Sequence, residues 1–370
     1  MNAEHGGNIR ALALELGCSE KEISDMSSNL NPFGPPDGLV AHLQGRLSEI
    51  FALPEVDARA MIQDFAGFYE LDPARVIAGN GTTQLIDAIP QALSAEKPLI
   101  LGPTYSEYAR ACRMHALKPQ FFVAESHDDF CPDIRALSRA VAGHDLVFLC
   151  NPNNPTGAMI PRRELLALVD EHPRVRFVVD ESYLPFVTGA ENTTLIRVEQ
   201  PNLFILNSMS KIFRIPGLRV GFLVGPAGVM PSFTPFSQPW SVNALAQSAV
   251  RFLMRNRQAT KVFLHKSRQL MQEEKSRFLR AAAQCDFLHF FPGVTYFLLA
   301  SVSKDHCVRT ICRDLGRKRI LIRDCANFEG LPPGFLRISL KTANENQTLL
   351  AHLLRLFTEP EQQACLETLF

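Results

Sequence analysis

Short apolar runs alternate with amphipathic segments between about residues 75 and 225. The apolar runs, such as DLVFLCNP and VRFVVDES, are rich in β-branched or aromatic residues and are hydrophobic on both faces. Runs of this kind are typical of buried strands in a largely parallel sheet. The segments between them, such as TTQLIDAIPQAL and RRELLALVDEH, repeat apolar positions at helical spacing. This alternation predicts an α/β domain of three layers, with a mostly parallel sheet in the middle.

The pattern changes after about residue 240. A helical pattern of about forty residues follows, and we expect it to break near Arg255–Gln258. Beyond it the chain alternates as strand VTYFLLA, helix CVRTICRDLG, strands RILIRDC and FLRISLK, and helix NENQTLLAHLLRLF, which predicts a smaller α+β domain. We therefore expect three parts, namely an N-terminal segment (1–40) that packs with the small domain, a large domain (41–255) and a small C-terminal domain (256–370).

Composition and charge exclude several classes of protein. The chain is 46% hydrophobic and 21% charged with a formal net charge of zero, which is typical of a globular protein and gives no overall basic field for nucleic acid. The nine cysteines are scattered without a C-x-x-C pair, which predicts reduced thiols and no zinc site. No apolar run reaches the roughly 18 residues that cross a bilayer, and the first residues do not read as a secretory signal. We expect a soluble, cytoplasmic protein without a metal.

Polar residues gather where the predicted strands end, and ligands of open α/β sheets bind at the carboxyl ends of the strands. The segment AGNGTTQLI follows one strand and begins a helix, whose free N–H groups and dipole favour an anion near Gly81, Thr82 and Thr83. A plain glycine turn with a helix cap explains this segment equally well. Asp180 ends VVDESY and could likewise be a helix cap. Lys211 follows another strand in SMSK, where desolvation would lower the pKa of its amine and make it a better nucleophile toward an aldehyde.

One chemistry uses all of these residues together. A phosphorylated pyridine aldehyde needs an amine for its aldehyde, an acid for its ring nitrogen and donors for its phosphate, and also an aromatic face and a donor for the ring oxygen. The sequence offers candidates for each role: Lys211 for the aldehyde, Asp180 for the ring nitrogen, Thr82 and Arg219 for the phosphate, Tyr105 for stacking and Asn154 for the ring oxygen.

The segments GNGTTQ, PTYSEY, NPNNPTG, DESY and SMSKIFRIPGLRVG resemble the fold-type I enzymes that depend on pyridoxal 5′-phosphate, in the class I/II aminotransferase superfamily. The resemblance implies a homodimer with active sites near the subunit interface. It also implies that Lys211 holds the cofactor covalently and later moves protons, and that Ser208 contacts the phosphate. The catalytic candidates are Lys211, Asp180 and Tyr105, and the cofactor-binding candidates are Gly81, Thr82, Thr83, Tyr105, Asn154, Asp180, Ser208, Lys211 and Arg219.

The two ends of the chain resemble one subfamily more closely. HGGNIRALALELG, QPWSVNALA, ILIRDCANFEGL and FLRISLKTANEN are similar to the L-threonine-O-3-phosphate decarboxylases, lyases that make aminopropanol phosphate for cobalamin biosynthesis. The histidinol-phosphate aminotransferases are near relatives of this subfamily. The resemblance implies a small phosphorylated amino acid as substrate and, as substrate-binding residues, His5, Gly6, Asn29, Asn154, Arg323 and Arg337. A forked guanidinium such as that of Arg337 suits a carboxylate.

Several alternatives stay open at this point. Arg323 could pair with Asp324 or another acid, and HGG could be a tail outside the site. The subfamily usually has a tyrosine that reaches the partner subunit's cofactor, and Leu53 stands at its place in ALPEVDA. The motifs do not separate a decarboxylase acting on threonine or serine phosphate from an aminotransferase. A regulatory protein that binds the cofactor without turnover is disfavoured, because Lys211, Asp180 and Arg219 are all present.

Overall fold

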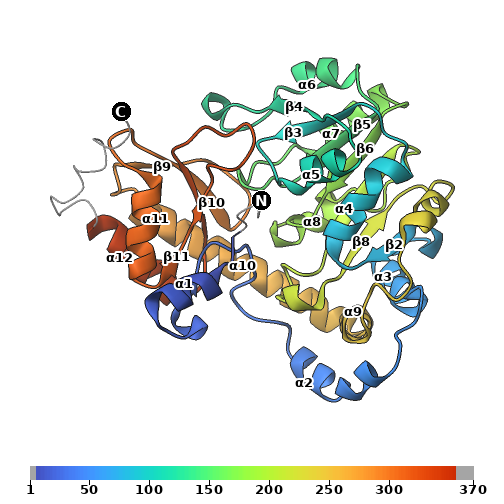
Figure 1. Ribbon diagram of the computed structural model, residues 1–370, viewed down its shortest axis with the longest axis horizontal. Helices are drawn as coiled ribbons and strands as arrows, with labels where there is room; N and C mark the ends of the chain where they lie inside the picture. The colour runs from blue at the N-terminus through green and yellow to red at the C-terminus, as the bar shows by residue number, and fades with distance from the viewer. Residues whose placement is uncertain (1–5, 356–370) are drawn as a thin grey trace.

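The computed structural model describes residues 6–355, and its larger sheet has seven strands in the order β2-β8-β7-β6-β5-β3-β4 (Figure 1). The five strands from β7 to β4 run parallel, whereas β8 is antiparallel to both of its neighbours. Strands β3, β5, β7 and β8 are buried along their whole length, as their apolar runs predict. The strands of this sheet are β2 (Val76–Gly79), β3 (Pro98–Gly102), β4 (Gln120–Val123), β5 (Leu146–Cys150), β6 (Arg176–Asp180), β7 (Leu203–Ser208) and β8 (Gly221–Val224).

The order of the strands places helices on both faces of this sheet. The chain moves outward from β3 to β4 through α5 (Glu107–Met114) and returns through α6 (Ile134–Val141) and α7 (Arg162–Glu171) to β5 and β6. Because such crossovers are right-handed, the outward and returning helices lie on opposite faces. The packing agrees, since α5 contacts α4 (Gly81–Ala92) while α6 contacts α7. The three-layer α/β architecture predicted from the sequence is confirmed.

The second sheet has four antiparallel strands in the order β12-β13-β10-β9, flanked by α11 (Val308–Arg317) and α12 (Ala343–Arg355). A separate pair of short parallel strands joins the N-terminal part of the chain to this region, and α1 (Ile9–Leu16) lies beside it (Figure 1). The strands of these sheets are β9 (Leu288–Phe290), β10 (Phe297–Val302), β12 (Arg323–Asp324) and β13 (Phe335–Ser339), with β1 (Ser24–Asp25) and β11 (Ile320–Leu321) forming the pair.

The single strand expected for RILIRDC is wrong. The segment divides at Ile322, so that β11 pairs with β1 while β12 pairs with β13 of the four-stranded sheet. The physical reason is that the N-terminal segment supplies a partner for the first half of this run, which the sequence pattern alone does not reveal. The division brings the N-terminal segment close to Arg323.

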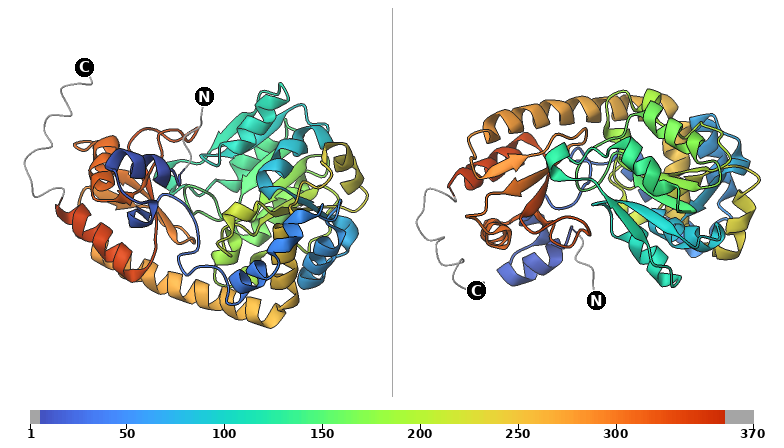
Figure 2. Two further views of the ribbon diagram at one scale, coloured as in Figure 1. Left: turned by 60° about the horizontal axis from the view of Figure 1, so that its bottom comes forward. Right: turned by 90° about the horizontal axis from the view of Figure 1, so that it is seen from above.

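The long helical pattern breaks as predicted, between α9 (Ala244–Arg255) and α10 (Arg257–Ala282). The break lies at Asn256, whose side-chain amide donates to the carbonyl of Phe252 at 2.8 Å, while Thr260 Oγ1 donates to the carbonyl of Leu253 at 2.6 Å. These side chains satisfy carbonyls that the end of α9 leaves without helical partners. Helix α10 then runs along one side of the molecule past both sheets (Figure 2). The remaining α-helices of the described residues are α2 (Leu39–Gln44), α3 (Arg59–Tyr69) and α8 (Ala190–Thr193).

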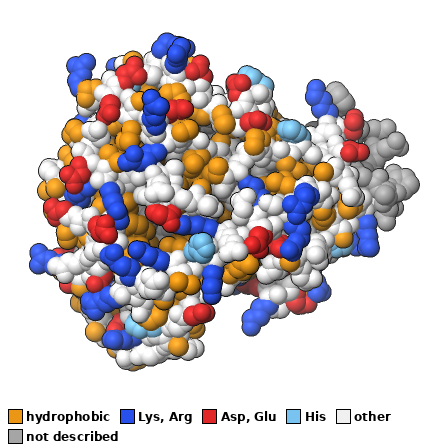
Figure 3. Space-filling view, turned by 180° about the vertical axis from the view of Figure 1, so that it is seen from behind, with side chains coloured by type: hydrophobic (Ala, Val, Ile, Leu, Met, Phe, Trp, Pro, Cys, Tyr) orange, Lys and Arg blue, Asp and Glu red, His pale blue; other side chains and the backbone are white. Residues whose placement is uncertain are grey.

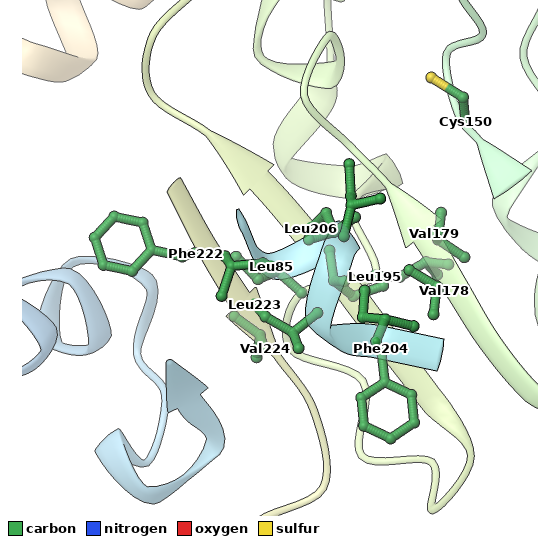
Figure 4. Close-up of a cluster of buried hydrophobic side chains, with 14 of the residues drawn as sticks. Leu85, Cys150, Val178, Val179, Leu195, Phe204, Leu206, Phe222, Leu223 and Val224 are labelled. Atoms are coloured by element: carbon green, nitrogen blue, oxygen red, sulfur yellow. The ribbon is translucent and has the colours of Figure 1, made fainter. Parts of the chain in front are cut away.

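The main hydrophobic core lies between the large sheet and its helices. Figure 4 shows part of it, where Leu85 of α4 lies among side chains of β7 and β8, including Leu206 and Phe222. A second core beneath the smaller sheet includes Leu298, Leu336 and Ile338. Each sheet thus packs on its own hydrophobic core, and the candidate site lies between the two sheets.

Candidate active site

Two adjoining cavities, of about 90 and 140 Å³, lie at the carboxyl ends of the parallel strands. The inner cavity is lined by residues that end or follow β5, β6 and β7 and by the start of α4, and the outer one also by residues of the N-terminal segment and the smaller sheet. Both are lined by Tyr105, Asn154, Tyr183 and Lys211. The site therefore lies where β3, β5, β6 and β7 end, around the point at which the chain reverses its direction across the sheet, as is usual for open α/β sheets.

Lys211 lies in the wall of both cavities, three residues after the end of β7. Burial, together with the positive charges of Arg219 and Arg337, lowers the pKa of its amine to about 8, while Asp180 acts in the opposite direction. A lysine with an ordinary pKa is almost entirely protonated at neutral pH, so this environment increases the fraction of neutral, nucleophilic amine.

Asp180 is the last residue of β6 and is only 4% exposed. Its Oδ2 accepts a hydrogen bond of 2.7 Å from the hydroxyl of Tyr108, and its Oδ1 accepts one of 2.9 Å from the backbone N–H of Ser182. Burial raises the pKa of Asp180, and these two hydrogen bonds oppose the rise. Burial also raises the pKa of Tyr108, so its hydroxyl stays protonated and donates. The carboxylate is thus fixed in one orientation at the floor of the inner cavity.

The start of α4 and the turn before β8 form a cradle for an anion. Thr82 and Thr83 in the first turn of α4 line the inner cavity together with Ser208 and Arg219. A Cβ atom on Gly81 would lie 2.5 Å from Nη2 of Arg219, so only glycine allows the guanidinium to approach the helix start this closely. The Pro216–Leu218 turn ends at Arg219, which has a φ of 54°, and this bend carries its side chain back to the cavity.

Two arginines of the smaller sheet face the outer cavity. Arg323 and Arg337 are directly opposite each other on β12 and β13, and they are 8% and 5% exposed. Arg337 Nη1 donates to Oδ1 of Asn154, and its Nη2 donates to the carbonyl of Ser27 at 2.5 Å. Its buried Nε has no hydrogen-bond partner among the described residues. Arg323 Nη2 donates to Oδ1 of Asn327 at 2.7 Å, and Oδ1 of Asp324 accepts from the backbone N–H of Ala326 at 2.9 Å.

The N-terminal residues complete the outer cavity. Gly6 and Asn29 line it. The side-chain amide of Asn29 donates to the hydroxyl oxygen of Tyr183 at 3.2 Å, and its Oδ1 accepts from the hydroxyl of Ser339 at 2.5 Å. His5 lies outside the described residues. Apart from His5, all the predicted site residues thus come together in the two cavities, except that Gly81 lies behind Arg219 rather than in the lining.

The donor set fits pyridoxal 5′-phosphate. The inner cavity combines a half-buried amine, a buried carboxylate and an aromatic ring with the hydroxyl-rich, cationic cradle at the start of α4. These are the groups needed for an aldehyde, a pyridine nitrogen, a ring face and a phosphate. Gly81 leaves room in this cradle for the Arg219 guanidinium, and a Cβ on Gly221 would lie 2.7 Å from the N–H nitrogen of Thr82, so both glycines keep it open.

The comparison with protein families agrees with this geometry, since the model for "Aminotransferase class I and II" matches residues 21–353. The chain belongs to this family. It is a pyridoxal phosphate-dependent enzyme of the fold type that its sequence motifs resemble.

The similar proteins within the aminotransferase family include both decarboxylases and aminotransferases. The threonine-phosphate decarboxylase of Salmonella typhimurium is 31% identical over 361 residues, covering 96% of this chain and 97% of that protein. The crystal structure of L-threonine-O-3-phosphate decarboxylase from Porphyromonas gingivalis matches with a TM-score of 0.80 and 30% identity, covering 90% of this chain and 99% of that one. The histidinol-phosphate aminotransferase of Methanothermobacter thermautotrophicus is 28% identical, covering 93% of this chain and 92% of that protein.

Sequence reasoning missed three residues that this aminotransferase-family site uses. Tyr108 orients Asp180, Tyr183 lines both cavities and holds Asn29, and Asn327 holds Arg323. Tyr108 is only 1% exposed and reads in the sequence as a core residue of a helix. Tyr183 stands in the DESY motif beside Asp180, and that position was the available signal.

Other features bear on what surrounds the site. Leu53 is 74% exposed and lies beside α9, in a groove separate from the two cavities. None of the eight cysteines in the described range forms a disulfide, and no described helix is both long and apolar enough to cross a membrane. On the face shown in Figure 3, basic and acidic side chains are intermingled.

Proposed function

We propose that the chain decarboxylates L-threonine O-3-phosphate to aminopropanol phosphate, a reaction that would serve cobalamin biosynthesis. The observation that carries this proposal is the pair Arg323 and Arg337, buried opposite each other on β12 and β13 and facing the cavity that holds Lys211. The full-length similarity to two threonine-phosphate decarboxylases supports the same substrate class.

Two buried arginines directly opposite each other favour an anionic ligand beside them. Like charges directly opposite each other on neighbouring strands destabilise a sheet, and burying cations removes their hydration. A ligand with two anionic groups offsets both costs. Threonine phosphate carries a carboxylate and a phosphate, whereas the whole chain has no net charge that could attract it. The attraction must therefore be local, and these arginines supply it.

We assign the residues as follows. Asp180, oriented by Tyr108, would face the ring nitrogen of the cofactor, Tyr105 its ring and Asn154 its ring oxygen. Thr82, Thr83, Ser208 and Arg219 would hold its phosphate, with Gly81 shaping that pocket. Arg323, Arg337, Asn29, Asn154 and Gly6 would hold the substrate, and His5 is proposed for the same role on resemblance alone.

Bound pyridoxal phosphate supplies an aldehyde that condenses with the substrate amine and a ring that accepts an electron pair. In the decarboxylation the bond between Cα and the carboxylate carbon breaks, carbon dioxide leaves, and a proton takes its place at Cα. Lys211, with a pKa of about 8, can both accept and donate a proton at this position. Arg323 and Arg337 hold the substrate at two points, which limits rotation at Cα and thereby selects the bond that breaks.

The test is to incubate the holoenzyme with L-threonine phosphate and no keto acid, and to measure carbon dioxide and aminopropanol phosphate. Equimolar release of both is expected. L-serine phosphate lacks one methyl group, so we expect it to react about 10- to 200-fold less efficiently. If threonine phosphate gives no product while histidinol phosphate is turned over with a keto acid as acceptor, the chain is an aminotransferase and the proposal is wrong.

We also propose that the chain acts as a homodimer. Exposed apolar side chains cluster between α2 and α3, including Ile50 (58% exposed), Phe51 (87%) and Leu53 (74%). Exposed apolar patches commonly mark interfaces. Sedimentation at micromolar concentration is expected to give twice the mass of the 41.3 kDa chain, and a monomer would contradict this.

A further inference from the structure

The loop that follows β1, residues 26–29, forms one wall of the outer cavity through Ser27, Ser28 and Asn29. Two cationic side chains hold its backbone from the side of β13. Arg337 Nη2 donates to the carbonyl of Ser27 at 2.5 Å, and Lys341 Nζ donates to the carbonyl of Ser28 at 2.9 Å. The position of this loop therefore helps to determine where the guanidinium of Arg337 lies.

A single carboxylate organises the loop. Oδ1 of Asp25 accepts from the backbone N–H groups of Ser27 and Ser28, at 3.0 and 3.2 Å, and from the hydroxyl of Ser27 at 2.6 Å. Oδ2 accepts from the hydroxyl of Ser28 at 2.5 Å. An ionised carboxylate offers only acceptors, and here both oxygens are used by two consecutive serines. The loop consequently has one preferred arrangement.

The hydroxyl of Ser27 extends this arrangement to the N-terminal segment. A serine hydroxyl has one hydrogen, and here Asp25 accepts it, so the remaining lone pairs of Oγ can only accept. The backbone N–H of Gly7 donates to them at 2.7 Å. Gly6 packs directly on the same residue, because a Cβ atom at position 6 would lie 2.4 Å from the carbonyl oxygen of Ser27. Gly7 has a φ of +88°, which other residues rarely adopt.

We propose that Asp25 is a positioning residue for substrate binding, acting through Ser27 to hold the Gly6–Gly7 segment against the cavity and to place the carbonyl that restrains Arg337. This inference rests on the proposed function in one respect, namely that the ligand of this cavity is an anionic amino acid. Asp25 does not line the cavity itself, so it acts on the cavity through Ser27 and Ser28, of which Ser27 accepts the hydrogen bond from Gly7.

Ser27→Ala tests the link from Asp25 through Ser27 to Gly7, because it removes the acceptor of the Gly7 N–H and leaves Asp25 its backbone donors. We expect faster hydrogen–deuterium exchange at the Gly7 amide, read by mass spectrometry of N-terminal peptides in the absence of substrate. We also expect KM to rise about tenfold while kcat changes much less, since uniform binding is lost. Asp25→Ala should change exchange and KM in the same direction.

Ser28→Ala is the matched control for exchange, because it removes an equally short hydrogen bond to Asp25 and leaves the acceptor of the Gly7 N–H in place. Exchange at Gly7 should then stay at the wild-type level. Unchanged exchange in Ser27→Ala, or a loss of kcat with unchanged KM, would overturn the proposal. KM is measured with whichever phosphorylated amino compound the wild type turns over, and exchange needs no substrate. A failure of the proposed decarboxylase activity would therefore be distinguishable from a failure of this inference.

Discussion

Lys211→Ala is expected to abolish turnover and the covalent attachment of pyridoxal phosphate. The amine of Lys211 faces both cavities, and we assign proton transfer at Cα to the same amine. Loss of general acid–base catalysis alone typically costs about 10²–10⁴-fold in rate, and loss of the nucleophile adds to this, so kcat should fall by at least about 10³-fold. Borohydride reduction followed by peptide mass analysis should find the cofactor on Lys211 in the wild type and on no peptide of the variant.

Lys275→Ala provides a matched control. Burial also lowers the pKa of Lys275 to about 8, but its Nζ donates to the carbonyls of Gly293 and Thr295, and it does not line either cavity. This variant should lose thermal stability and keep covalent attachment. Attachment that survives in Lys211→Ala would refute our assignment of the lysine.

The pH dependence of attachment gives the same assignment a second measurement. Only the neutral amine attacks an aldehyde, and the pKa of Lys211 is lowered from 10.5 to about 8. In the apoenzyme the attachment rate should therefore rise about tenfold per pH unit below pH 8 and level off above it. A rate that still rises at pH 10 would mean that the lysine has an ordinary pKa.

Much of the inner cavity could be predicted from the sequence because its residues lie at the ends of strands. The end of a strand such as VRFVVDES can be read from the sequence, because its apolar run stops at polar residues. Parallel strands bring their carboxyl ends to one edge of the sheet, so Asp180 and Lys211 were expected to be neighbours. The chemistry of the cofactor then connected them with Thr82 and Arg219. Bringing these residues together required only the order of the strands and the chemistry of the cofactor, not the orientation of any side chain.

The contacts that orient these residues could not be predicted in this way. The hydrogen bond from Tyr108 to Asp180 depends on how α5 is rotated about its axis relative to the sheet. A tyrosine in an amphipathic helix usually indicates only core packing. The pairing of Arg323 with Arg337 depends on strand register, and a shift of one residue would turn one side chain to the other face. Nothing in the pattern of DMSSN shows that Ser27 meets Gly7.

Arg337→Lys is expected to lower kcat/KM by about 30-fold to several thousandfold while leaving the cofactor attached to Lys211. Truncating one partner of a buried, hydrogen-bonded charge pair typically costs about 2–5 kcal/mol, and each 1.4 kcal/mol is a factor of ten. Lysine keeps the charge but lacks the fork that bonds Asn154 and Ser27 at once and presents Nε as a further donor. Steady-state kinetics with threonine phosphate, together with the visible spectrum of the bound cofactor, measure both effects.

Arg268→Lys is the control for loss of a largely buried arginine. Arg268 lies on α10, donates to the carbonyl of Pro185 and pairs with Glu191 at 2.8 Å, outside both cavities. It should change stability and leave kcat/KM within about threefold of the wild type, as expected for a residue without a role in transition-state binding. Equal losses in the two variants would show that Arg337 acts through folding rather than through the substrate.

Arg337→Gln separates the charge of this residue from its hydrogen bonds. The positive charge of Arg337 helps to lower the pKa of Lys211, so a neutral side chain should move the midpoint of cofactor attachment to higher pH, whereas Arg337→Lys should leave it nearly unchanged. Both variants should lose substrate affinity, because neither offers the guanidinium fork. If the midpoint moves equally in both, Arg337 influences Lys211 through the shape of the cavity and not through its charge. The electrostatic link between the substrate-binding arginine and the cofactor-binding lysine would then be wrong.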